Sequence, residues 1–221
     1  MHNMRFKALN PDMRIISIIF LFIFMISACD SEKLQSETKP NVDSLAIQLS
    51  MSATERFGEY IFGRIDSPDS LELSLNELDR AIEIEPNLYE LYTAKVNILL
   101  ALDRNEQAIQ VSKEVLVIKP DLVEAMAFIG FINQKIGENE IAQEWYQKAI
   151  TGYNQRIEEE RFVINSKINK AFLLLFTEDE VAAMKAFEKV KQEYPKNSEV
   201  EFMEQFITNI DKEQFLNELY K

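Results

Sequence analysis

Small and apolar residues recur along this chain of 221 residues at a fixed spacing of 34 positions. Three columns keep this spacing: Ser74, Ala108 and Ala142; Ala81, Val115 and Ala149; and Pro86 and Pro120, which Asn154 continues. The next members of the columns, Ala183, Val190 and Pro195, follow after 41 positions. One insertion of seven residues therefore separates the third unit from the fourth. A period of this length predicts a stacked array of similar structural units.

Local signals divide these units into helices. Four predicted helix starts have a capping residue with a glutamate three positions later, and a proline precedes three of them. These capping residues are Asn87, Asp121, Thr177 and Ser198. The predicted helices are 43–65, 70–84, 88–102, 105–118, 122–136, 138–153, 156–176, 178–193, 198–209 and 212–220.

The spacing and the residue types resemble the tetratricopeptide repeat (TPR) family, whose repeat has 34 residues. The matching residues are Met126, Ile129, Gly130, Gly137, Ala142, Tyr146 and Ala149 in the third unit, Tyr92, Leu99, Ala108 and Pro120 in the second, and Ala171, Leu174, Ala183, Phe187 and Pro195 in the fourth. The first unit is degenerate, because Phe62 stands where the family has a small residue. The resemblance implies an all-α, TPR-type solenoid of about four helix pairs plus C-terminal capping helices.

Three packing expectations follow from the resemblance. Gly130 should face Ala142, because only small side chains let the two helix axes of a pair approach closely. Gly152, near a predicted helix end, should tolerate a larger side chain. The last two helices should cover the open apolar face of the array. The covering residues would be Phe202, Phe206, Phe215 and Leu219.

In TPR proteins the first helices of the pairs line a concave groove that binds a peptide or helix of another protein. The resemblance places the following residues in that groove: Glu90, Thr93, Asn97, Leu100, Glu124, Ala127, Phe131, Gln134, Asn165, Ile168, Phe172 and Leu175. Arrays that bind C-terminal carboxylates carry Lys and Arg at several of these positions, and this chain shares only Asn97 with them, so a carboxylate clamp is not expected. Phe131, Ile168 and Phe172 indicate either apolar anchors for a partner or core residues covered by the insertion or the cap.

The first 28 residues have the layout of a secretory signal peptide. Basic residues precede an apolar run over 15–26, which is shorter than the ~20 residues of a membrane-spanning helix. The run ends in Ile26-Ser27-Ala28-Cys29, which resembles the lipobox of bacterial lipoproteins. The resemblance implies removal of the leader and a lipid anchor at Cys29. The alternative is an ordinary secreted protein with a chance cysteine after its cleavage site.

Residues 29–42 are polar and are expected to form a flexible tether. Asp30, directly after the cysteine, resembles the inner-membrane retention signal of some bacteria, whereas the short acidic cluster there resembles the surface-export signal of others. The membrane and its face, periplasmic or external, are therefore left open. The repeat array is expected over 43–196 and the capping helices over 197–221.

Composition excludes several kinds of chemistry. His2 is the only histidine and Cys29 the only cysteine, so a chain cleaved before Cys29 has no His-assisted nucleophile, no Cys/His zinc site and no internal disulfide. Glycine-rich phosphate and dinucleotide motifs are missing, and the run 158–160 of glutamates is expected to be a solvated face. The net charge of −13 disfavours nucleic acid as a partner. We therefore expect a protein that is not an enzyme and uses no cofactor, metal or small-molecule substrate.

Three functions fit these features. The first is a membrane-anchored scaffold that binds another protein in a complex of the bacterial envelope. The second is an assembly or chaperone lipoprotein that transiently holds unfolded outer-membrane substrates. The third is a structural subunit whose groove is filled by its own C-terminal helices. A stoichiometric co-purifying protein favours the first, a mixture of unfolded β-barrel chains the second, and a monomer with an occluded groove the third.

The lipobox predicts that replacing Cys29 by Ser removes the acylated side chain. The Cys29→Ser protein should keep its leader or leave the membrane fraction, because the acyl chains supply the stable anchor. Membrane fractionation and the mass of the N-terminal peptide measure this. A variant that is cleaved after Ala28 and sediments with membranes like the wild type would show that the lipobox assignment is wrong.

Overall fold

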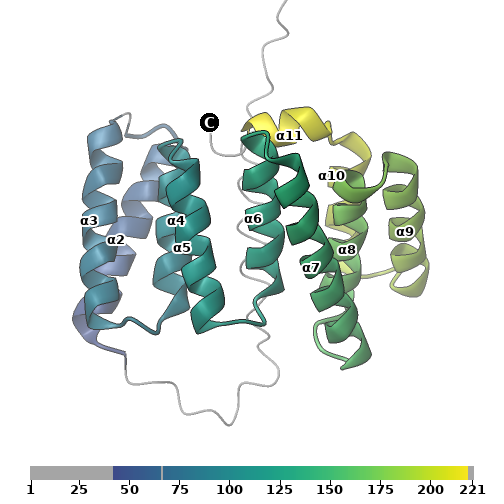
Figure 1. Cartoon of the computed structure of the whole chain (residues 1–221), viewed down its shortest axis with the longest axis horizontal. Coiled ribbons are helices and arrows are strands. Elements are labelled where there is room, and N and C mark those ends of the chain that lie inside the picture. Colours follow the sequence, from purple (N-terminus) through teal and green to yellow (C-terminus); the bar gives the residue numbers. More distant parts are fainter. Residues whose placement is uncertain (1–41, 66, 219–221) are drawn as a thin grey trace, which may run out of the picture.

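The computed structural model describes residues 42–65 and 67–218, and within these ranges it contains ten helices and no strand (Figure 1). The helices are α2 (Ser44–Ile61), α3 (Pro68–Ile84), α4 (Tyr89–Ala101), α5 (Asn105–Ile118), α6 (Val123–Lys135), α7 (Asn139–Glu158), α8 (Val163–Thr177), α9 (Glu180–Glu193), α10 (Ser198–Asn209) and α11 (Lys212–Glu218). The prediction of an all-α fold is confirmed. The predicted leader, Cys29 and nearly all of the tether lie outside the described residues.

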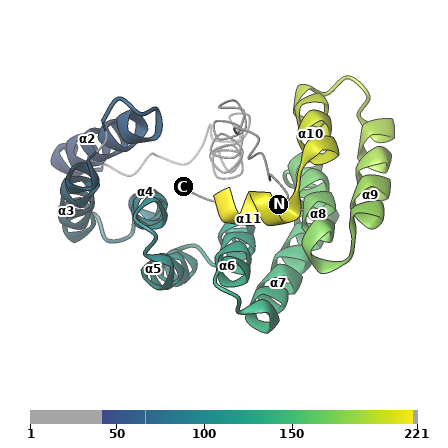
Figure 2. The same ribbon diagram turned by 90° about the horizontal axis from the view of Figure 1, so that it is seen from above.

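Consecutive helices pack in pairs, α2 with α3, α4 with α5, α6 with α7 and α8 with α9. Figure 2 shows the pairs side by side along an arc, with α4, α6 and α8 on its inner side and α5, α7 and α9 on its outer side. Helix α10 packs against α8 and α9, and α11 turns back along the inner side of the arc to contact α6. The chain is thus a TPR-type solenoid of about four pairs with two further helices at its C-terminal end.

Close contact between the two helices of the third pair explains its small residues. A Cβ atom on Gly130 would lie 2.5 Å from the ring of Tyr146 and 3.3 Å from the carbonyl oxygen of Ala142. The expectation that Gly130 faces Ala142 is therefore confirmed. The turn that joins these helices contains Gly137 with a φ of 89°, and Asp103, 34 positions earlier, also has a positive φ, of 56°. The turns of the second and third units thus share a positive φ at equivalent positions.

The seven-residue insertion lengthens α7. Helix α5 ends at Ile118, whose equivalent 34 positions later is Gly152, but α7 continues to Glu158. The predicted break at 154–155 is therefore wrong, and the chain turns instead at 159–162. Glu160 and Phe162 adopt positive φ values of 56° and 48° in this turn. The insertion extends an outer helix of the arc.

Gly152 lies well inside this longer helix and packs as tightly as Gly130. A Cβ atom on Gly152 would lie 2.6 Å from Cγ2 and 3.1 Å from Cγ1 of Val123, the first residue of α6. The expectation that Gly152 tolerates a larger side chain is therefore wrong. That expectation assumed that the helix ends near residue 153, whereas α7 continues to Glu158.

Several predicted helix ends also differ from the structure. Helix α2 ends four residues earlier than expected, so Phe62 lies beyond it and is 59% exposed. The caps of α9 and α10 are Asp179 and Asn197, whose carboxylate and amide oxygens accept backbone N–H groups, rather than Thr177 and Ser198. Helices α4 and α6 begin without a side-chain cap. The capping boxes expected at Asn87 and Asp121 are therefore not formed.

This packing predicts that both glycines are intolerant of a side chain. We expect Gly130→Leu and Gly152→Leu each to lower the free energy of unfolding by about 1 to 3 kcal/mol, because overpacking pushes the helices apart. Gly58→Leu is the control, since no atom lies within 4 Å of a Cβ built there and leucine has the higher helix propensity. Urea denaturation measures the three midpoints. Equal midpoints would contradict the described packing.

Candidate protein-interaction face

The structure places most of the predicted groove residues in the protein interior. All of them lie on α4, α6 and α8, the inner helices of the arc, as the TPR register implies. Leu100, Ala127, Phe131, Ile168, Phe172 and Leu175 are at most 7% exposed, Asn97 is 9% exposed, Thr93, Gln134 and Asn165 are half-buried, Glu90 is exposed and Glu124 is buried. For Phe131, Ile168 and Phe172 the structure thus agrees with the alternative of covered core residues, and the role of these positions in binding remains a prediction.

Four aromatic side chains of the third and fourth helix pairs pack on one another and form what we call the aromatic cluster. Phe131 of α6 lies 4.9 Å from Phe176 and 5.9 Å from Phe172 of α8, measured between ring centroids, in edge-to-face geometry. Tyr146 of α7 lies 5.4 Å from Phe131 and 5.7 Å from Phe176. Such ring pairs contribute ~0.5 to 1.5 kcal/mol each beyond the burial of their area. They join the third helix pair to the fourth.

Phe215 of α11 completes this aromatic cluster. Its ring lies 5.4 Å from Phe131, 5.5 Å from Phe172 and 5.7 Å from Phe176, and it is 3% exposed. The ammonium of Lys212 lies 5.4 Å from the centroid of Phe176, a separation at which a cation is attracted to the ring face. The concave face is thus filled here by the C-terminal helix of the same chain.

Phe202, which was also expected to cover the array, is not buried as Phe215 is. Phe202 of α10 is 37% exposed, so the expectation that it belongs to the covering face is corrected. The side chain of Phe206 and all of Leu219 lie outside the described part of the chain. Of the two predicted covering residues whose side chains the structure describes, Phe202 and Phe215, Phe215 is the one that it brings to the concave face.

The hydroxyl of Tyr146 is the polar component of the aromatic cluster. It donates a hydrogen bond to Oε1 of Gln134, at 2.7 Å. Burial raises the pKa of Tyr146 far above its ordinary value of 10, so the phenol is neutral at neutral pH and donates this bond. Gln134, predicted as a groove residue, therefore holds the Tyr146 ring in place.

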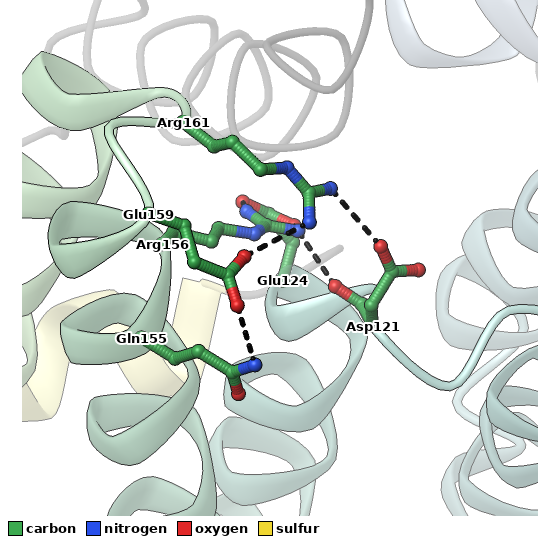
Figure 3. A network of polar contacts seen from close by, with 6 residues as sticks. All are labelled: Asp121, Glu124, Gln155, Arg156, Glu159 and Arg161. Carbon is green, nitrogen blue, oxygen red and sulfur yellow. Dashed lines mark hydrogen bonds and ion pairs between the residues drawn. The ribbon is translucent and has the colours of Figure 1, made fainter.

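A buried ion pair ties the extended end of α7 to the beginning of α6 (Figure 3). Nη1 and Nη2 of Arg156 lie 2.6 and 3.1 Å from the two carboxylate oxygens of Glu124, and the side chains are 8% and 3% exposed. Nη2 also donates to the backbone oxygen of Asp121, at 2.8 Å. A bidentate contact of this kind fixes both the position and the orientation of the guanidinium group relative to the carboxylate. Glu124, which was expected in a capping box and in the groove, therefore forms a buried ion pair with Arg156.

A more exposed layer of contacts lies beside this pair in Figure 3. Arg161 donates to the carboxylates of Asp121, at 3.3 Å, and Glu159, at 3.2 Å. A hydrogen bond from Gln155 and the nearby Arg161 lower the pKa of Glu159. Glu159 was predicted to lie on a solvated face, and its side chain, 41% exposed, does so. Exposed pairs of this kind contribute little to stability.

Arg156 is not among the residues predicted from the sequence, because its place inside a helix follows only from the extension of α7. Tyr153 and Arg156 belong to the part of α7 beyond Gly152, and both are buried. A usable signal was present, since opposite charges 32 positions apart also pair in Glu72–Arg104 and Asp103–Lys135. In Glu72–Arg104 and Asp103–Lys135 that spacing joins neighbouring repeats, whereas in Glu124–Arg156 it joins the two helices of the third pair.

The remaining described surface offers a polar cavity and no metal site. The cavity, of about 370 Å³, lies between α3, α4 and α5, and two ion pairs, Glu72–Arg104 and Asp79–Lys95, line it. Across the described ranges, no group of three or more His, Cys, Asp or Glu side chains could hold a metal ion. The aromatic cluster with α11 is therefore the best-defined candidate for a functional site.

The chain is similar to a solved structure at low sequence identity. No protein-family model matches it, and no curated protein matches it. Its similarity to the crystal structure of MamA protein covers 77% of this chain and 89% of that chain, with 14% identity and a TM-score of 0.42. The TPR-type solenoid is therefore indicated by the helix pairs of this chain and their 34-residue spacing.

The two arginines of Figure 3 provide a matched pair of variants. Arg156→Met should lower the free energy of unfolding by about 3 to 5 kcal/mol, because it leaves the Glu124 carboxylate buried without a counter-charge. Arg161→Met should change it by less than about 1 kcal/mol, because Arg161 is 49% exposed. Glu124→Gln combined with Arg156→Met should recover part of the loss. Denaturation midpoints measure these differences, and equal effects of the two single variants would contradict the account.

Proposed function

We propose that this protein is a lipid-anchored, TPR-type scaffold of the bacterial envelope that binds another protein through the concave face of its array. The observation that carries the proposal is the aromatic cluster on the inner side of the arc. Three phenylalanines from two inner helices converge there, and a seven-residue helix covers them. Converging aromatic rings in a concave site are the usual anchors of a protein–protein contact.

The anchoring part of the proposal depends on the leader sequence. Basic residues, an apolar run and the lipobox Ile26-Ser27-Ala28-Cys29 occur in the order that bacterial lipoproteins have. Within the residues that the structure describes, no helix combines the length and apolar character needed to cross a membrane. A lipid on Cys29 would attach the array to a bilayer through the polar segment 30–42. The two signals after Cys29 support different destinations, the inner membrane and the cell surface, and both remain candidates.

A second candidate is a structural subunit whose groove is permanently closed by α11. The burial of Phe215 favours it, since this ring is 3% exposed and contacts three phenylalanines. In that case the outer surface of the array, rather than its inner side, would carry any contacts with other proteins. The two candidates differ in whether the aromatic cluster affects binding.

Affinity purification of the intact lipoprotein, with Leu replacing one ring at a time, separates the candidates. Phe131→Leu and Phe172→Leu keep an apolar side chain but remove the ring and its ring-pair contacts, so we expect variants that stay folded with a lowered melting temperature, and recovery of a stoichiometric partner reduced about tenfold or more. Phe202→Leu is the control on the exposed side of α10. Full recovery of the partner by the stable ring variants would contradict binding at the concave face and support the structural subunit.

A further inference from the structure

We infer that α11 occupies the docking site of the partner, and that the partner binds there with a short amphipathic helix of the same chemistry as α11. The inference deepens the proposed function and rests on it. It specifies the site as the surface formed by Phe131, Phe172 and Phe176. It specifies the partner segment as a helix with a basic residue followed, three positions later, by an aromatic residue and then an aliphatic one.

The contacts of α11 define this chemistry. Phe215 inserts its ring among the three phenylalanines at centroid distances of 5.4 to 5.7 Å. Leu216, the next residue, is 9% exposed and belongs to the same core. Lys212 lies one helical turn before Phe215 and places its ammonium 5.4 Å from the centre of the Phe176 ring. The surface therefore accepts an aromatic ring, an adjacent aliphatic side chain and a cation on one helix face.

The charge of the chain favours the same kind of ligand. The net charge is −13, so the field of the protein attracts a lysine or arginine side chain that the partner segment brings to the surface. A basic residue at the position that Lys212 now occupies would gain both this general attraction and the contact with Phe176.

The length and the attachment of α11 make it replaceable. It has seven residues, whereas an isolated helix needs ~12 to 15 residues to be marginally stable in water, so α11 depends on its contacts with the array. Two residues, Ile210 and Asp211, connect it to α10. This short connection keeps α11 at a high local concentration at the site, so it competes with a partner without preventing binding.

A labelled peptide with the sequence of residues 210–221 tests the inference on the full-length protein by fluorescence anisotropy. Phe215→Ala removes the anchor of the internal helix and leaves Phe131, Phe172 and Phe176 in place. We expect this variant to bind the peptide at least ~10-fold more tightly than the wild type does. Phe202→Ala, which removes an exposed phenylalanine of α10, should match the wild type. A peptide with Ala in place of its phenylalanine should not bind, and adding Phe172→Leu to Phe215→Ala should abolish the gain.

Two results would overturn the inference. One is a Phe215→Ala protein that keeps the wild-type circular dichroism spectrum but binds the peptide no better than the wild type. The other is a wild-type dimer, seen by light scattering, that Phe215→Ala converts to a monomer, because the occupant would then be the α11 of a second copy. If Phe215→Ala gains peptide binding but no envelope protein co-purifies with the wild type, the docking surface stands and the proposed function fails.

Discussion

Edge-to-face packing of Phe131, Phe172 and Phe176 is the interaction on which the rest of this structure depends. These rings hold the inner helices of the third and fourth pairs together, and they form the surface on which α11 packs through Phe215. Because ring edges and faces attract each other in a limited set of orientations, the cluster constrains how α6 and α8 lie. The concave face, its occupant and the proposed partner site all follow from this constraint.

The extension of α7 supplies a second constraint, within the third pair. Arg156 reaches Glu124 only because α7 continues beyond Gly152, and the buried pair joins the end of α7 to the start of α6. A buried ion pair adds little net stability relative to an apolar contact of the same shape, but it penalises any arrangement in which one charge is left alone. The pair therefore favours this arrangement of α6 and α7 in the third pair, whose helix α6 carries Phe131.

The sequence was most informative where a feature recurs. The 34-residue columns predict the helix pairs, and Gly130 and Ala142 form the expected close contact, because a repeated packing site limits residue size at the same position each time. Features outside the period were missed or misplaced. The extension of α7 beyond residue 153 and the tight packing of Gly152 depend on tertiary contacts, and local capping signals do not encode those contacts. Residue type and register predict a phenylalanine on an inner helix but not what covers it.

Hydrogen exchange of the full-length protein, followed by mass spectrometry, tests most directly whether α11 is a detachable occupant of a stable array. Backbone amides of residues 210–218 should exchange well before those of α6 and α8, because α11 can leave the aromatic cluster while the helix pairs stay folded. Adding a basic, aromatic amphipathic peptide should speed exchange in 210–218 and slow it in α6. Exchange of 210–218 only together with α6 and α8, at the rate of global unfolding, would contradict the account.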